Sequence, residues 1–132
     1  MVLNMWSLWI FGDNIEDQLG SIKFLVFYFL CGLVAALTHS VLNPMSEVPV
    51  VGASGAVWSL MAMYALYYPE RVFNIYFVIP AKIKYIVGIY FIIEVILALS
   101  SNDGVSHIAH IGGALTGFIV YLSDIRGFQS IK

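Results

Sequence analysis

Charged side chains are scarce in this chain: they make up only 11% of its 132 residues, whereas hydrophobic residues make up 61%. A soluble domain carries charge on about a quarter of its residues. This chain has too little charge to cover a water-exposed surface, so we expect it to be surrounded mostly by lipid. The formal net charge is -2 and no basic cluster exists, which argues against nucleic acid as a partner. Cys31 is the single cysteine, which excludes an internal disulfide.

Four apolar segments are long enough to cross a bilayer, which takes about 20 residues. Residues 1–12 are also apolar, but as a helix they would reach only about 18 Å. Backbone inside lipid must satisfy its own hydrogen bonds, so all these segments are predicted to be helices. The predicted fold is an all-α, polytopic membrane helical bundle in a single domain over residues 1–132, with four full transmembrane helices and a partial N-terminal one. The four full segments are roughly 24–42, 48–69, 85–102 and 104–123.

Basic residues are predicted to lie on one side of the membrane. They fall in the loop after the partial helix, in the loop between the second and third full segments, and in the tail: Lys23, Arg71, Lys82, Lys84, Arg126 and Lys132. The opposite loops, 39–50 and 101–106, contain no Lys or Arg. Since basic residues stay on the cytoplasmic side, we expect these two loops outside and the C-terminus in the cytoplasm. The expected location is the cell membrane of a bacterium or archaeon.

Ser54 and His110 are the polar residues most suggestive of chemistry. Ser54 stands in GASG, near the outer end of its segment, with Gly52 and Gly55 on either side. Such a serine can be a nucleophile beside helix N–H groups that stabilise an oxyanion. GASG alone, however, is more often a patch of small residues for helix packing. His110 enters the membrane from the same side to a similar depth, so the two side chains can meet, with His110 as general base.

Three further residues are predicted to support this pair. Gly113 and Gly117 form a G-x-x-x-G spacing, which lets two helix backbones pack tightly. Because His110 lies three residues before Gly113, this packing is expected to set the distance to Ser54. Trp58 follows Ser54 by four residues and so lies on the same helical face, where it can pack beside the His110 ring.

Glu94 and His107 have competing interpretations. His107 and His110 are spaced as two metal ligands can be, but no cysteine or carboxylate cluster completes a site, so we expect no metal and no cofactor. His107 is expected at the outer water boundary. Glu94 either makes a polar contact inside the bundle, which we favour, or belongs to an ion pathway. With no carboxylate clearly placed behind His110, a Ser–His dyad is predicted rather than a triad.

Three motifs together resemble the rhomboid family over Asn4 to about Tyr121. NMWSLWIFGDNIEDQLG resembles the family's second core helix and following loop, GASG its nucleophile motif, and HIAHIGGALTG its catalytic-histidine helix. The resemblance implies an intramembrane serine protease that cleaves transmembrane helices of membrane proteins. Ser54 would be the nucleophile and His110 the base, while the Asn4 amide and the Ser54 backbone N–H would hold the oxyanion.

The resemblance also implies a path for the substrate. The 101–106 loop would cap the site from outside, and the 85–102 helix would flank lateral entry from the bilayer. Two departures from the family pattern stand out. Its first core helix and the start of its second have no counterpart after Met1, and a tyrosine is common at the position of Trp58. The alternative is a proteolytically inactive rhomboid-like protein or fragment that binds membrane helices. A transporter or channel fragment would require more intramembrane charge than Glu94.

Overall fold

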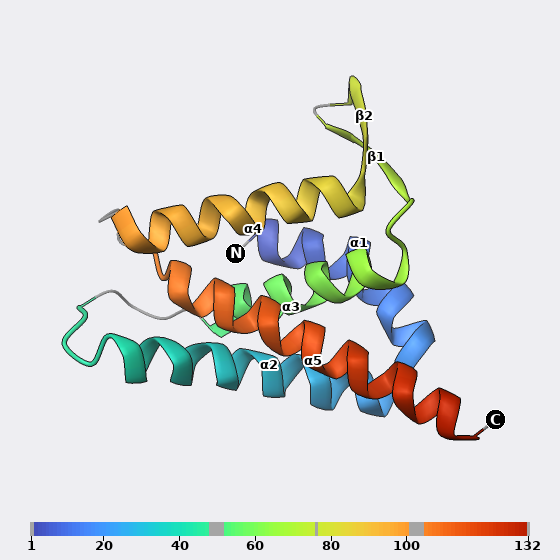
Figure 1. The fold of residues 1–132 in the computed structure, drawn as a ribbon, viewed down its shortest axis with the longest axis horizontal. Helices are drawn as coiled ribbons and strands as arrows, with labels where there is room; N and C mark the ends of the chain where they lie inside the picture. The colour runs from blue at the N-terminus through green and yellow to red at the C-terminus, as the bar shows by residue number, and fades with distance from the viewer. Residues whose placement is uncertain (1, 48–51, 76, 101–104, 132) are drawn as a thin grey trace.

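The computed structural model describes residues 2–47, 52–75, 77–100 and 105–131, and these form five helices and one β-hairpin (Figure 1). The elements in order are α1 (Val2–Leu19), α2 (Ser21–Leu42), α3 (Gly52–Tyr67), β1 (Val72–Ile75), β2 (Ile79–Lys82), α4 (Ile83–Ser100) and α5 (His107–Ile131). The helical part agrees with the predicted all-α fold. The hairpin was not predicted, because two four-residue strands within the expected 70–84 loop are too short to show a clear alternation.

The first helix is longer than the sequence predicted. It continues through the polar stretch after residue 12, because Ile15 in that stretch is fully buried against the core. It ends at Leu19, and the next residue, Gly20, has a φ of 83°, which suits a residue without a Cβ. Lys23 therefore lies in the first turn of α2 and not in a loop, so that part of the prediction is wrong.

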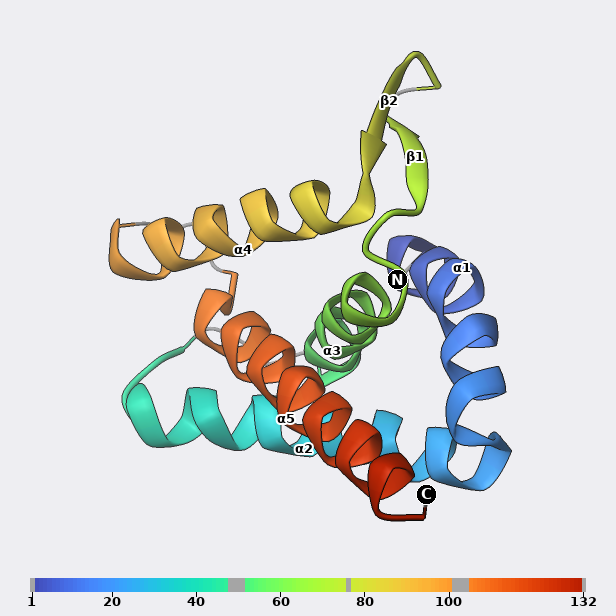
Figure 2. The same cartoon turned by 45° about the vertical axis from the view of Figure 1, so that its right-hand side comes forward.

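Helix α3 lies at the centre of the bundle and packs against each of the other four helices. Figure 2 shows α3 and α5 lying between α2 on one side and α4 on the other. The junction of α1 with α2, the hairpin and the C-terminus gather at one end of the molecule (Figure 1). The starts of α3 and α5 lie at the opposite end, so any groups on these two starts are on the same side.

Large aromatic side chains form the core at the hairpin end. Tyr64 of α3 packs edge-on against Phe11 of α1, with ring centroids 5.0 Å apart, and against Phe73 of β1 at 6.0 Å. Strands β1 and β2 pair antiparallel with Val72 opposite Lys82. The hairpin is thus joined to the buried cluster of the bundle through Phe73.

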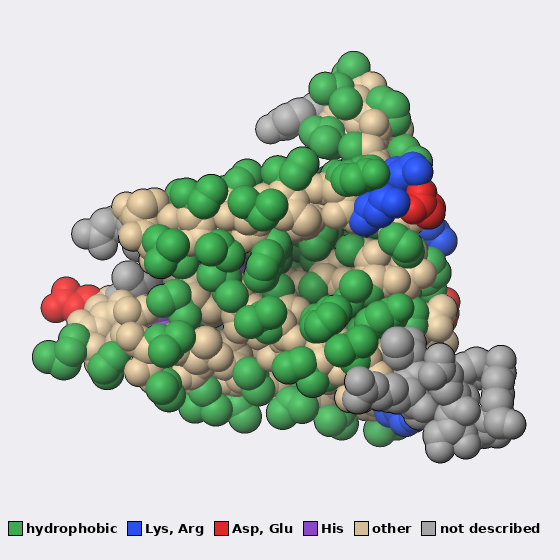
Figure 3. Space-filling view, in the orientation of Figure 1, with side chains coloured by type: hydrophobic (Ala, Val, Ile, Leu, Met, Phe, Trp, Pro, Cys, Tyr) green, Lys and Arg blue, Asp and Glu red, His purple; other side chains and the backbone are tan. Residues whose placement is uncertain are grey.

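Charged groups of the hairpin region pair with one another at the surface. The Glu70 carboxylate lies 2.5 Å from the ammonium groups of both Lys82 and Lys84. These hydrogen bonds, that of Lys82 first, lower the pKa of Glu70 to about 2. Figure 3 shows Lys and Arg side chains gathered at this end, while hydrophobic side chains cover most of the visible face.

The exposed faces of two helices are apolar. Among the described residues, α2 and α4 are long and apolar enough to cross a membrane by length and composition. Their exposed large hydrophobic residues include Leu25, Val26, Phe29, Leu33 and Leu37 on α2, and Ile89, Tyr90, Ile92, Ile96 and Leu99 on α4. Such wide apolar surfaces mark contact with a membrane or with other proteins. Helix α3 has 16 residues, and the count of four full spans stays a prediction.

Candidate functional site

Helices α3 and α5 touch backbone to backbone. A Cβ added to Gly113 would lie 2.0 Å from the carbonyl oxygen of Gly55, and one added to Gly117 would lie 2.4 Å from that of Ser59. No side chain fits at either position without moving the helices. The G-x-x-x-G spacing on α5 therefore sets how closely the helix of GASG approaches the helix of the histidines.

Helix α2 closes on the same contact from the other side. A Cβ on Gly55 would lie 2.3 Å from the Cβ of Ala35, and one on Gly112 would lie 2.8 Å from Oγ1 of Thr38. The same Cβ on Gly55 would lie 3.4 Å from the carbonyl oxygen of Ala109 on α5. Small residues thus let three helices pack closely beside Ser54.

The His110 ring stacks on Trp58. Their ring centroids are 5.8 Å apart and their planes are inclined by 27°. Ser54 is a half-buried residue in the first turn of α3, one helical turn before Trp58 and on the same face of α3. The His110 ring therefore lies against Trp58, on the face of α3 that also carries Ser54.

The start of α5 is fixed by Ser106. Its hydroxyl oxygen accepts a hydrogen bond of 3.3 Å from the backbone N–H of Ala109, as an N-cap does. It also lies 2.6 Å from Nδ1 of His39, a buried residue in the last turn of α2. Because of this cap, α5 begins at His107 and not at residue 104 as predicted. No pattern in the sequence predicts this pairing of His39, which lies where the predicted 24–42 segment and the 39–50 loop overlap.

Glu94 reaches across from α4 to both histidines of α5. Its Oε2 is 2.6 Å from Nδ1 of His107, a hydrogen bond, and 3.1 Å from Nδ1 of His110. The exposed fractions of the three side chains are 14% for Glu94, 7% for His107 and 13% for His110. Two expectations are wrong here: His107 is buried rather than at a water boundary, and a carboxylate does lie behind His110.

Among the described residues, these same three could together hold a metal ion. Their ligand atoms all lie within 4.8 Å of one another, and two histidines with one glutamate are ligands that zinc accepts. A carboxylate therefore does accompany the histidine pair, contrary to the prediction. As the atoms stand, Glu94 and His107 are at hydrogen-bond distance and bind each other directly.

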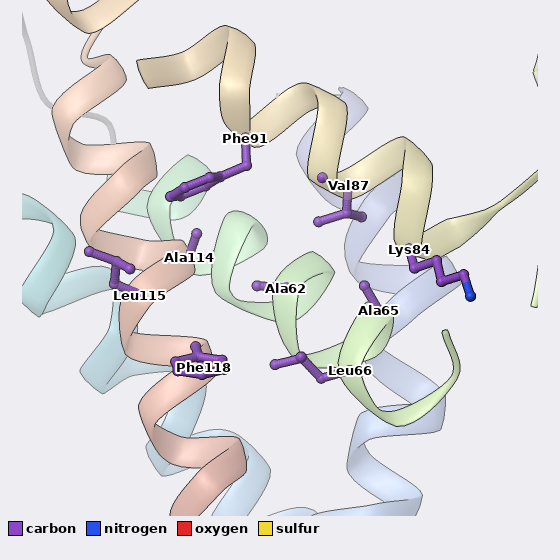
Figure 4. Close-up of a pocket in the computed structure, with 10 residues that line it drawn as sticks. Ala62, Ala65, Leu66, Lys84, Val87, Phe91, Ala114, Leu115 and Phe118 are labelled. Carbon is purple, nitrogen blue, oxygen red and sulfur yellow. The ribbon is translucent and has the colours of Figure 1, made fainter. Parts of the chain in front are cut away.

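An apolar groove of about 330 Å³ separates α4 from α3 and α5. Phe91 projects into it from α4, opposite Ala114 and Phe118 of α5 and Ala62 of α3 (Figure 4). The α5 residues follow His110 by one to two turns, so the groove lies beside the Ser54–His110 level and toward the hairpin. Along this groove, α4 does not pack tightly against α3 and α5.

For the remaining predicted site residues, the structure gives a position in the fold. Asn4 is half-buried in the first turn of α1, a helix that packs on α3. Gly52 is the first residue of α3. Of the predicted outer loops, residues 48–50 and 101–104 lie outside the described residues, and residues 39–42 belong to α2. The oxyanion role of Asn4 and the capping role of the 101–106 loop stay predictions.

Comparison with known proteins gives a consistent answer. Residues 1–126 match the Rhomboid domain family. The chain is 30% identical to RHOMBOID-like protein 6, mitochondrial, of Arabidopsis thaliana over 100% of this chain and 42% of that protein. It is 30% identical to Rhomboid protease AarA of Providencia stuartii, over 95% of this chain and 50% of the relative. Rhomboid protease GluP of Bacillus subtilis is 28% identical over 89% of this chain and 22% of the relative. No solved structure matches.

The relatives show how much of a longer protein this chain matches and in which organisms and compartments similar proteins occur. The chain spans half or less of each of these proteins. They come from bacteria and from a plant, and a mitochondrial protein of Danio rerio also matches, at 30% identity. The expectation of a bacterial or archaeal membrane is therefore not supported by these relatives.

Proposed function

Because the chain belongs to the rhomboid family of membrane proteins, we propose that it is an intramembrane serine protease in which Ser54 is the nucleophile and His110 the general base. One observation carries the proposal. The His110 ring stacks on Trp58, one turn along α3 from Ser54, and Gly113 lets α5 pack closely against Gly55, the residue after Ser54. This arrangement supports the proposal, because acyl transfer requires a serine and a histidine that can approach each other on neighbouring helices.

The proposed reaction uses both residues twice. Ser54 Oγ attacks the carbonyl carbon of the scissile peptide bond while Nε2 of His110 takes the hydroxyl proton. The tetrahedral intermediate collapses, the C–N bond breaks, and His110 gives the proton to the leaving amine. Water then attacks the Ser54 ester with His110 again as base, releasing the acid and restoring the serine.

The oxyanion of the intermediate would lie at the start of α3. Ser54 belongs to the first helical turn, where backbone N–H groups point outward and the helix dipole favours negative charge. The resemblance assigns Asn4 as a second donor to this oxygen. Trp58 would fix the plane of the His110 ring by stacking, without contributing the hydroxyl that a tyrosine carries.

The proposed substrate is a transmembrane helix of another membrane protein. Helical peptide bonds are shielded by their own hydrogen bonds, so a segment must unwind before Ser54 can attack it. Helix α4 buries only Ile83 and Val87, which makes it the helix least held by the bundle. Entry beside α4 would therefore disturb few contacts of the core.

The test is loss of covalent and proteolytic activity in matched variants. The chain would be reconstituted in lipid vesicles with a fluorogenic transmembrane-helix substrate and, separately, a fluorophosphonate probe. Ser54→Ala and His110→Ala should each abolish cleavage, and the double variant should be no worse than either, since members of one catalytic unit are not additive. Ser40→Ala, which removes an exposed serine of α2, should cleave normally. Full cleavage by Ser54→Ala would refute Ser54 as the nucleophile. Binding of the substrate without cleavage by the unaltered chain would favour an inactive rhomboid-like protein that binds membrane helices.

A further inference from the structure

Glu94 is an acidic residue in an otherwise apolar helix, and its carboxylate is turned inward. The sequence of α4 is IKYIVGIYFIIEVILALS, with Glu94 as its one acidic residue. Placing a carboxylate away from water is costly unless it is paired. Glu94 is not needed to fill the aromatic core at the hairpin end, to which α4 contributes Ile83 and Val87. The free-energy cost of burying this carboxylate suggests that Glu94 has a function where its carboxylate lies.

The carboxylate lies against one particular nitrogen of the proposed base. Oε2 of Glu94 is 3.1 Å from Nδ1 of His110. That nitrogen is buried and makes no hydrogen bond within the described part of the chain, so the short distance does not have hydrogen-bond geometry. Trp58 covers the ring face. With Nδ1 directed at Glu94, Nε2 is the ring nitrogen left for Ser54.

A carboxylate beside Nδ1 decides which nitrogen of a neutral imidazole carries the proton. A proton on Nδ1 leaves the lone pair on Nε2, the form that can accept a proton from a serine hydroxyl. The same negative charge stabilises the imidazolium that forms when the serine attacks. Catalytic hydrogen bonds are often long in a resting protein and tighten during the reaction, so 3.1 Å with poor alignment is compatible with this task.

We propose that Glu94 is the positioning residue of the base, holding His110 with its proton on Nδ1 and pairing with it when it becomes charged. The inference rests on the proposed protease function and extends the Ser54–His110 pair to a Ser–His–Glu relay. His107, hydrogen-bonded at 2.6 Å to the same oxygen, holds the carboxylate in the resting protein. As His110 takes up the serine proton, Oε2 turns from His107 to His110.

The decisive variant is Glu94→Gln, which keeps the size of the side chain and removes its charge. The rate of Ser54 labelling by the fluorophosphonate should fall by about 10²-fold or more, because labelling needs the base but no membrane substrate. Glu94→Asp, which keeps the charge, should recover part of the rate. Asp124→Asn is the matched control: it removes a carboxylate that accepts a hydrogen bond from Tyr67 and joins α3 to α5 elsewhere, and it should label normally.

A second measurement separates positioning from mere structural support. In the Ser54→Ala background, the ¹⁵N chemical shifts of the His110 ring at neutral pH should show a proton on Nδ1. Adding Glu94→Gln should shift the ring toward the other tautomer. A proton on Nε2 of His110 with Glu94 intact would overturn the proposal, even if Glu94→Gln failed to fold.

The failures of the two proposals are distinguishable. Unchanged labelling in both Ser54→Ala and His110→Ala would refute the protease itself. Loss in those two variants with unchanged labelling in Glu94→Gln would overturn only the role of Glu94. Loss of labelling by the wild-type chain after treatment with a chelator would also overturn it, since Glu94, His107 and His110 would then be holding a metal ion.

Discussion

Gly113→Ala is the sharpest test of how the two helices of the site are spaced. The new Cβ would lie 2.0 Å from the Gly55 carbonyl oxygen, and real contacts of this kind essentially never fall under 3.0 Å. Helices α3 and α5 must therefore separate by about 1 Å at this level. Overpacking of this kind costs about 1–3 kcal/mol of stability. A displacement of about 1 Å between reacting groups costs about 10²-fold in rate.

The matched control is Gly88→Ala on α4. A Cβ at Gly88 meets nothing within 4 Å, and alanine favours a helix over glycine by about 1 kcal/mol, so stability and rate should be preserved. Both variants would be unfolded by SDS titration in mixed micelles and assayed with the fluorophosphonate and the transmembrane substrate. Equal labelling rates for Gly113→Ala and Gly88→Ala would show that the glycine contact does not set the site, and the argument from helix spacing would fail.

Three other outcomes follow from described contacts. Ser106→Ala should lower the stability of α5 by about 1 kcal/mol through loss of its N-cap, and an unchanged unfolding midpoint would contradict the capping role. The side-chain carboxyl of Glu70, followed by NMR, should titrate near pH 2, because its pKa is lowered from 4.5 to about 2. Its pairing with the lysines is therefore complete at neutral pH, persists below pH 4.5 and is lost as the pH falls toward 2. Lys82→Met should raise the midpoint of this titration, and a midpoint already near 4.5 in the unaltered chain would contradict the pairing. A membrane-impermeant thiol reagent added from outside should label Ser46→Cys and miss Lys82→Cys, with little background from the buried Cys31; the reverse pattern would refute the predicted orientation.

The helices and their packing were largely accessible from the sequence. Long apolar runs define helices by the chemistry of lipid alone, and the spacing of Gly113 and Gly117 marks a face where no side chain intrudes. The spacing of Ser54 and Trp58 likewise places two residues on one face whatever surrounds them. These are local regularities, which hold wherever the helix lies.

Features that depend on where one helix ends and another begins were missed. The polar stretch after residue 12 looks like a loop, and only the burial of Ile15 against other helices makes it helical. The contact of Glu94 with His107 and His110 depends on how the chain turns between α4 and α5. Glu94 and the two histidines lie on different helices, so no regular spacing in the sequence predicts their contact. His39 is paired with Ser106, 67 residues away, which no local pattern predicts.

Helix α4 is buried against the rest of the protein only near its start, so a small tilt of the helix moves its far end by a larger distance. Its two buried residues, Ile83 and Val87, lie in its first two turns, so the helix is held at its base beside the hairpin. Glu94 lies eleven residues from Ile83, about 16 Å along the axis at about 1.5 Å per residue. A tilt of only about 5° about that base moves the Glu94 carboxylate by about 1.4 Å, which is enough to break a 2.6 Å hydrogen bond to His107. Any helix that leans on α4 from the bilayer therefore acts directly on the histidines of α5, with the displacement growing along the length of α4.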